Sequence, residues 1–272
     1  MAPNYLDLSA LKFSKDFEEL KAINTRAKCP QCCMMRKFYC YDCAVPVSHE
    51  PPKPQTRLPL KVIVVRHNSE KPSKSSIIPL KLVFPLDVDL HVFTQPDRFD
   101  QTQKIGTISP VFDPEIDWTK TAIVFPGETA RTVHEFDRSI LSDSIIQDSE
   151  SQILNIVLID STWSTAIQVI QKTPELQRVP YMIKLGSTNQ TIFWRHQRIG
   201  RECLATCEAA YVFFRELWDA CNPDTLYDRR YDDLLYYYIY IHSVVNEHYR
   251  TTKRHKGHLP QYALVESLDE EN

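Results

Sequence analysis

The sequence predicts an α/β fold, in which helices flank a mainly parallel sheet and a small cysteine-rich module precedes it. Two observations predict the sheet. Apolar runs rich in β-branched residues alternate with segments of helical periodicity, and these runs lack the strict polar alternation of strands with one face in water. A third observation predicts the module. Cysteines crowd into residues 29–43, and a proline-rich stretch at residues 46–59 follows as a linker.

The predicted strands are short, apolar and bounded by proline, glycine or polar residues, which is typical of strands buried in a sheet. They lie at residues 60–65, 77–84, 121–125, 154–159 and 179–185.

Helical spacing of apolar residues marks the other elements, as at Phe17, Leu20 and Ile23. The predicted helices are residues 13–28, 162–172, 203–220 and 227–249, with a polar loop at 141–152. We divide the chain into an N-terminal helix with the cysteine module at residues 1–50, a main domain at 51–260 and an acidic flexible tail at 261–272.

The composition narrows the classes of function. The chain has 272 residues, 43% hydrophobic and 25% charged, the balance of an ordinary globular protein. No apolar run approaches the roughly 18 residues of a membrane span, and no GxGxxG or GxxxxGKS motif is present, which argues against a P-loop or typical dinucleotide-binding protein. The net charge of −3 means that nucleic-acid binding would need local basic patches. Without a signal segment, we expect the protein in the nucleus, with the cytosol as the alternative, where thiols stay reduced.

The cysteine module carries two CxxC knuckles, Cys29-Pro30-Gln31-Cys32 and Cys40-Tyr41-Asp42-Cys43. Each CxxC turn offers two thiolates to one ion, so Cys29, Cys32, Cys40 and Cys43 are predicted zinc ligands of a zinc-ribbon-like module. Four thiolates leave no open position, which indicates a structural site; the alternative is four reduced cysteines without metal. Of the remaining cysteines, Cys33 adjoins Cys32 and is a poor further ligand, and Cys203, Cys207 and Cys221 are expected in the core.

A polar tetrad, Asp160-Ser161-Thr162-Trp163, follows the predicted strand at 154–159 directly. Ligands of α/β sheets bind beyond the carboxyl ends of the strands, where Asp160 is expected to lie. Ser161 and Thr162 can cap the next helix, whose free N–H groups favour anions. The alternative is that Asp160 is only a helix cap and Trp163 only a core residue.

The tetrad resembles the DxTW signature of the DTW-domain family. Asn68 and Ser76 stand where the family usually has proline and threonine, and Ala205 stands where it often has serine, which weakens a side-chain contact there. The two knuckles also fit, and the resemblance runs from about residue 29 to residue 241. The other segments that resemble the family are Leu58-Pro59-Leu60-Lys61, Arg66-His67, Glu70, Lys74-Ser75-Ser76, Phe125-Pro126-Gly127, Phe193-Trp194-Arg195-His196-Gln197, Leu204-Ala205-Thr206-Cys207-Glu208-Ala209 and Tyr231-Asp232-Asp233-Leu234-Leu235.

The resemblance implies a fold related to the knotted SPOUT RNA methyltransferases and S-adenosylmethionine as donor. The implied reaction transfers the 3-amino-3-carboxypropyl group of the donor to the imide nitrogen of a tRNA uridine and releases methylthioadenosine. The alternatives are an aminocarboxypropyltransferase of ribosomal RNA, a SPOUT-type RNA methyltransferase, and a non-catalytic zinc-ribbon adaptor that binds RNA. We expect no membrane and no DNA partner, and the sequence leaves the oligomeric state open.

Roles follow for the residues that carry the resemblance. Asp160 is the expected general base, with Thr162 and Trp163 beside it. Trp163 can stack on adenine or pack below the site, and core packing is slightly favoured. The expected donor-binding residues are Phe125, Pro126, Gly127, Asp160, Ser161, Leu204, Ala205 and Thr206, although a plain turn and a plain helix start also explain these segments.

Basic residues are the expected contacts to RNA and to the carboxylate of the donor. The expected substrate-binding residues are Arg66, Lys74, Arg195, His196 and Arg198, and three of them, Arg66, Lys74 and Arg195, are candidates for the donor carboxylate. Two basic patches stand out, one formed by Arg195, His196, Arg198 and Arg201 and the other by Arg250, Lys253, Arg254 and Lys256. The alternative for either patch is a solvated charged face.

Overall fold

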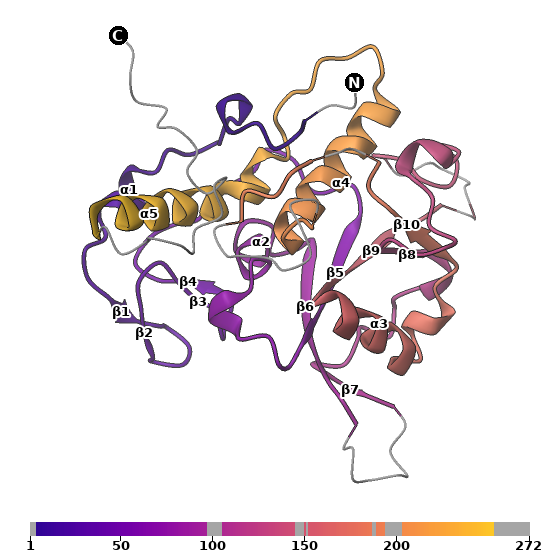
Figure 1. The fold of residues 1–272 in the computed structure, drawn as a ribbon, viewed down its shortest axis with the longest axis horizontal. Coiled ribbons are helices and arrows are strands. Elements are labelled where there is room, and N and C mark those ends of the chain that lie inside the picture. The colour runs from indigo at the N-terminus through magenta and orange to yellow at the C-terminus, as the bar shows by residue number, and fades with distance from the viewer. Residues whose placement is uncertain are drawn as a thin grey trace.

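A six-stranded, mostly parallel sheet forms the centre of the protein (Figure 1). The computed structural model describes residues 4–96, 105–144, 150, 152–186, 189–193 and 203–252. The strands are β5 (Lys61–His67), β6 (Val88–Thr94), β7 (Thr107–Ser109), β8 (Thr121–Val124), β9 (Asn155–Asp160) and β10 (Tyr181–Ile183). Their order is β10-β8-β9-β5-β6-β7, and only β7, at one edge, is antiparallel. The predicted α/β class with a mainly parallel sheet is confirmed.

Both faces of the sheet are buried, as the apolar runs predicted. Along β5, Val62 and Val64 enter one core and Ile63 and Val65 enter another. The second core lies under α3 (Trp163–Lys172), and the first lies under α2 (Ile78–Val83), α4 (Thr206–Cys221) and α5 (Tyr236–Thr252). Successive side chains of a strand point to opposite faces, so a strand between two helical layers must be apolar throughout.

One predicted strand is wrong. The predicted strand at 77–84 is instead the buried helix α2 (Ile78–Val83) with its two cap residues. A short apolar run fits a buried helix as well as a buried strand, and Pro79 in the first turn supplies the fixed φ angle with which helices begin. The strand that follows, β6, was not predicted, because Asp89 and His91 interrupt its apolar character.

The other predicted elements differ mainly in their ends. The helix at 162–172 and the strands at 60–65, 121–125, 154–159 and 179–185 are confirmed within one to two residues at each end. The predicted helix at 203–220 begins at Thr206, and that at 227–249 begins at Tyr236, after the 3-10 helix η6 (Asp232–Leu235). The predicted helix at 13–28 shrinks to α1 (Glu18–Ala22).

The short elements complete the chain. They are the 3-10 helices η1 (Leu8–Ala10), η2 (Pro72–Lys74), η3 (Trp118–Lys120), η4 (Val133–Glu135) and η5 (Leu176–Arg178), and the two-residue strands β1 (Ala27–Lys28), β2 (Met35–Arg36), β3 (Tyr39–Cys40) and β4 (Val45–Pro46). The tail at 261–272 and part of the loop at 141–152 lie outside the described residues. Within the described ranges, no helix is both long and apolar enough to cross a membrane.

The N-terminal segment packs on the helical layer that contains α4. Tyr5 and Leu6 are buried, and the Tyr5 hydroxyl donates to Asp219 of α4 at 2.7 Å. The backbone N–H groups of Tyr5 and Leu6 also donate to the side-chain oxygen of Asn189, at 2.7 and 3.3 Å. These contacts fix Asn189, which matters because this residue lines the pocket described next.

Candidate functional site

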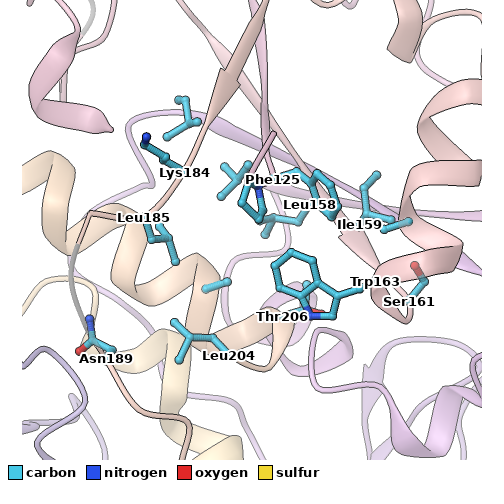
Figure 2. A pocket seen from close by; sticks show the side chains of 15 residues that line it. Phe125, Leu158, Ile159, Ser161, Trp163, Lys184, Leu185, Asn189, Leu204 and Thr206 are labelled. Carbon is cyan, nitrogen blue, oxygen red and sulfur yellow. The ribbon is translucent and has the colours of Figure 1, made fainter. Parts of the chain in front are cut away.

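A pocket of about 440 Å³ opens at the carboxyl ends of β8, β9 and β10 (Figure 2). This is the edge at which parallel sheets bind ligands, and the volume falls within the range of small-molecule sites. The first residues of α3 and α4 close it. The lining residues are Val124, Phe125, Pro126, Leu158, Ile159, Ser161, Trp163, Ala166, Ile183, Lys184, Leu185, Asn189, Leu204, Thr206 and Ala209.

Two aromatic rings form one wall of the pocket. Trp163 is 37% exposed and packs on Phe125 with 5.3 Å between ring centroids and 42° between planes. The favoured interpretation of Trp163 as a core residue is therefore wrong. A half-exposed indole beside a phenyl ring offers a flat apolar surface to a planar ligand ring.

Asp160, the last residue of β9, is buried just behind the pocket rather than lining it. The Ser75 hydroxyl donates to its Oδ2 at 2.6 Å, and the Thr206 hydroxyl donates to its Oδ1 at 2.7 Å. Burial raises the pKa of the carboxyl group, while the two hydrogen bonds and the charge of Arg66 oppose that rise. Thr206 lines the pocket, so its hydroxyl joins Asp160 to the pocket interior.

The next two residues of the tetrad lie at the start of α3. Thr162 is its N-cap residue, but its hydroxyl contacts the hydroxyl of Thr165 and makes no capping bond to the backbone. The Ser161 hydroxyl donates to the Thr162 carbonyl at 3.1 Å. Neither side chain therefore completes the helix cap that the sequence suggested, and Ser161 faces the pocket instead.

Most of the predicted donor-binding residues come together at this pocket. Phe125, Pro126, Ser161, Leu204 and Thr206 line it, whereas Gly127, Asp160 and Ala205 adjoin lining residues without lining it themselves. A Cβ atom at Gly127 would lie 3.1 Å from Sδ of Met182, so glycine lets this turn pack against β10.

Sequence reasoning missed the wall of the pocket formed after β10. Lys184 and Leu185 follow the end of this strand, and Asn189 lies just beyond. A lysine near the carboxyl end of a predicted apolar strand was the available signal for this wall, because that is where sheet ligands bind.

The start of α4 is held by the carboxylate of Glu208, which is fully buried. Its Oε2 accepts from the Thr191 hydroxyl and the Ala205 N–H, each at 2.6 Å. Its Oε1 accepts from the Ile192 N–H at 2.8 Å and the Tyr238 hydroxyl at 2.9 Å. Burial raises the pKa of Glu208, against these hydrogen bonds. Four donors thus hold the segment after β10 against α4 and α5.

Ser76 supplies a cap to α4 from another part of the chain. The N-cap residue of α4 is Ala205, which has no side-chain oxygen. The Ser76 hydroxyl accepts from the Cys207 N–H at 3.3 Å, next to the bond from Ser75 to Asp160. Ser75 and Ser76 therefore join the ends of β9 and α4.

We expect Glu208→Gln to lower the melting temperature by roughly 5–10 °C. Every partner of the carboxylate is a donor, so either orientation of the amide places its NH₂ group against two of them. A buried donor without a partner costs about 1–3 kcal/mol, and each kcal/mol shifts the melting temperature of a chain this size by about 2–4 °C. The exposed Glu128→Gln is the control, and thermal unfolding of both variants measures the difference. Equal melting temperatures would contradict the assigned role.

The structure describes two of the five predicted substrate-binding residues, Arg66 and Lys74. Arg66 lies beside Asp160 in the register of β5 and β9, and its guanidinium donates to the Glu70 carbonyl oxygen. Lys74 ends η2, directly before Ser75. Neither lines the pocket. Arg195, His196 and Arg198 lie outside the described residues, as do Lys253, Arg254 and Lys256 of the second basic stretch.

The four knuckle cysteines converge on one point. The sulfur atoms of Cys29, Cys32, Cys40 and Cys43 all lie within 4.8 Å of one another. The residue after each knuckle, Cys33 or Ala44, has a positive φ angle, 59° and 51°, so both knuckles make the same turn. A set of four thiolates at this spacing fits a tetrahedral zinc ion.

The remaining cysteines stay apart from this cluster, as predicted. Cys33 is exposed and is not part of the cluster. Cys203 and Cys207 are buried, and Cys221 is half-buried.

The cysteine module packs on α5. Phe38 contacts Tyr240 with 5.3 Å between ring centroids, and Tyr39 contacts Tyr237 at 5.5 Å. His49, just after the module, has Nε2 2.7 Å from the Tyr237 hydroxyl. The cysteine module is therefore held in place by contacts with α5, a helix that packs on the central sheet.

Comparisons with known proteins agree on one family. The family model of the DTW domain matches residues 26–246. The chain is similar to proteins named tRNA-uridine aminocarboxypropyltransferase 1. That of Mus musculus is 29% identical over 257 residues, which cover 87% of this chain and 82% of the relative. That of Xenopus tropicalis is 27% identical over 243 residues, covering 82% and 80%. No solved structure matches. Because the family model spans most of its length, the chain belongs to the DTW domain family.

Proposed function

We propose that this protein transfers the 3-amino-3-carboxypropyl group of S-adenosylmethionine to the imide nitrogen of a uridine in tRNA. The observation that carries the proposal is the pocket at the carboxyl ends of β8, β9 and β10, with Asp160 directly behind it. This site lies within the segment that matches the DTW domain and the tRNA-uridine aminocarboxypropyltransferases. The resemblance to that family is also our ground for proposing a SPOUT-related fold and a nuclear protein.

The pocket suits a nucleoside-containing donor. Its lining is largely apolar, and Trp163 and Phe125 offer a flat wall to an adenine ring. When bound, the donor supplies a carbon atom made electrophilic by a sulfonium leaving group. The residues of the chain must then place that carbon, and not the methyl group, next to the uracil, so positioning supplies much of the catalysis.

Asp160 is the proposed proton acceptor. The imide nitrogen of uracil forms a bond to the propyl carbon as the bond from that carbon to sulfur breaks, and the sulfur keeps the electron pair in methylthioadenosine. The imide proton passes to the Thr206 hydroxyl, which lines the pocket, while Thr206 passes its own proton to Asp160. Trp163, the first residue of α3, lines the same pocket, and Thr162 is the N-cap residue directly before it.

Incubation of the purified protein with tRNA and S-adenosylmethionine tests the proposal. Mass spectrometry of the digested nucleosides should find a uridine heavier by one aminocarboxypropyl group, and the same nucleoside should be missing from cells without the protein. A uridine heavier by one methyl group would instead identify a methyltransferase. Modification of ribosomal RNA alone would identify a different substrate. Failure to bind the donor at all would favour a non-catalytic RNA-binding adaptor.

We further predict that the basic segments at residues 195–201 and 250–256 bind tRNA, since they concentrate positive charge in a chain of net charge −3. Reversing the charges of either segment should weaken tRNA binding and flatten its dependence on salt, because fewer counterions are released from the phosphates. Binding isotherms at several salt concentrations measure both quantities. An unchanged affinity and an unchanged salt slope would exclude that segment.

A further inference from the structure

One charged side chain stands in an otherwise uncharged lining. Among the described residues that line the pocket, Lys184 alone carries a charge. It follows the end of β10, and its N–H donates to the Arg131 carbonyl at 3.0 Å, which fixes its backbone beside the pocket. A lone cation on an apolar wall is a binding group for an anionic part of a ligand.

No protein carboxylate closes an ion pair with Lys184 within the described ranges. The pKa of Glu135 is lowered mainly by hydrogen bonds from Thr132, and the positive charge of Lys184 adds to that lowering. Glu135 is engaged elsewhere, because its Oε2 accepts from the Thr132 N–H at 2.6 Å and the Thr132 hydroxyl at 2.8 Å. The Lys184 ammonium group is thus available to a ligand.

Of the other candidate cations, the two that the structure describes, Arg66 and Lys74, do not line the pocket. Arg66 donates to the Glu70 carbonyl and lies beside Asp160, outside the pocket lining. Figure 2 shows Lys184 across the pocket from Ser161; this residue is exposed, and its ammonium group is directed away from Trp163 and Phe125. With an adenosine group against these two rings, the other end of the donor would lie on the side of Lys184, and a rotation of the lysine stem would bring the ammonium group to that end.

We propose that Lys184 binds the carboxylate of the aminocarboxypropyl group and so fixes the end of the donor that is transferred. This inference rests on the proposed function. Adenine against the aromatic wall and carboxylate at Lys184 would hold the propyl chain between two fixed points. The flexible four-carbon stem of lysine lets the ammonium group follow the carboxylate. Lys184 then selects donors that carry a carboxylate.

Calorimetry with two ligands tests this assignment. S-adenosylmethionine carries the carboxylate, and methylthioadenosine shares its adenosine and thioether parts but lacks the aminocarboxypropyl group. Lys184→Gln should weaken binding of S-adenosylmethionine by roughly 10- to 100-fold, the effect of one hydrogen bond between charged groups. Binding of methylthioadenosine should stay unchanged, and Lys184→Arg, which keeps the charge, should retain most of the affinity for S-adenosylmethionine.

A matched control and the contrary outcomes complete the experiment. Lys21→Gln removes an exposed lysine of α1, at the far end of the protein from β10, and should alter neither affinity. Equal binding of S-adenosylmethionine by Lys184→Gln and the unaltered protein would overturn the assignment. An equal loss of affinity for both ligands in Lys184→Gln would also overturn it. A loss of tRNA binding alone would overturn it too, and would make Lys184 a contact to the RNA phosphates. If the unaltered protein binds neither ligand, the proposed function fails first, and this inference fails with it.

Discussion

Asp160→Asn is expected to lower the rate of aminocarboxypropyl transfer by about a hundred- to ten-thousand-fold, the usual loss when a positioned general base is removed. The amide keeps the size and shape of the carboxyl group but cannot take up a proton at neutral pH. We expect the variant to fold, to bind tRNA and to retain zinc. The transfer assay with tRNA, run beside thermal unfolding, measures the effect. Near-normal turnover by a well-folded Asp160→Asn protein would rule out the general base.

Asp160 also joins two hydroxyl groups, so a control must separate proton transfer from positioning. Both Ser75 and Thr206 donate to the carboxylate, and the single oxygen of an asparagine amide cannot accept both in the same way. Ser75→Ala removes one of these bonds and leaves the base and Thr206 in place, so we expect a loss of about tenfold at most. Thr206→Val removes the hydroxyl that faces the pocket and should approach the loss of Asp160→Asn. Equal losses in Ser75→Ala and Asp160→Asn would indicate positioning.

The pH dependence gives a second test of the same residue. A carboxyl group must be ionised to accept a proton, so the transfer rate should rise as the pH rises through the pKa of Asp160. Burial raises this pKa, which moves the rising part of the profile above the range of an exposed aspartate. Asp160→Asn should lose this part of the profile. An unchanged profile in the variant would assign the pH dependence to another group.

The site was predictable from sequence where local chemistry determines it. Asp160 follows a long apolar run, so its place at the end of a buried strand could be predicted from the residues around it. Its partners could not be predicted from spacing. Ser75 and Thr206 are 85 and 46 residues away, and only the packing of η2, β9 and α4 brings their hydroxyl groups together. Burial of Glu208 against Tyr238 likewise depends on the tertiary fold.

The sequence-based predictions that the structure contradicts also have local causes. The run at 77–84 carries no polar residue except Lys81, so periodicity could not separate a strand from a buried helix. For Trp163, core packing was only slightly favoured over stacking on a ligand, and the pocket leaves its ring partly exposed. The predicted strand at 179–185 includes Lys184, but β10 ends at Ile183, and this earlier end places Lys184 at the pocket.

Loss of the metal is expected to have the largest effect on stability. We predict one zinc ion per chain, bound by the four converging cysteines, and a fall in melting temperature of about 10 °C or more in Cys40→Ser. Structural zinc contributes about 10–16 kcal/mol of binding free energy in small zinc modules, and each kcal/mol lost from a chain of this size lowers the melting temperature by about 2–4 °C. Cys40 is fully buried, so its replacement also leaves a polar group in the centre of the module.

The effect should extend beyond the cysteine module, because Phe38 and Tyr39 pack on Tyr240 and Tyr237 of α5. Cys33→Ser is the matched control. It replaces an exposed cysteine next to Cys32 that lies outside the cluster, so both zinc content and melting temperature should stay unchanged. Elemental analysis and thermal unfolding, with and without a chelator, measure these quantities. Protein prepared with reductant and added zinc that holds no metal, or that unfolds at the same temperature after chelation, would contradict a structural zinc site.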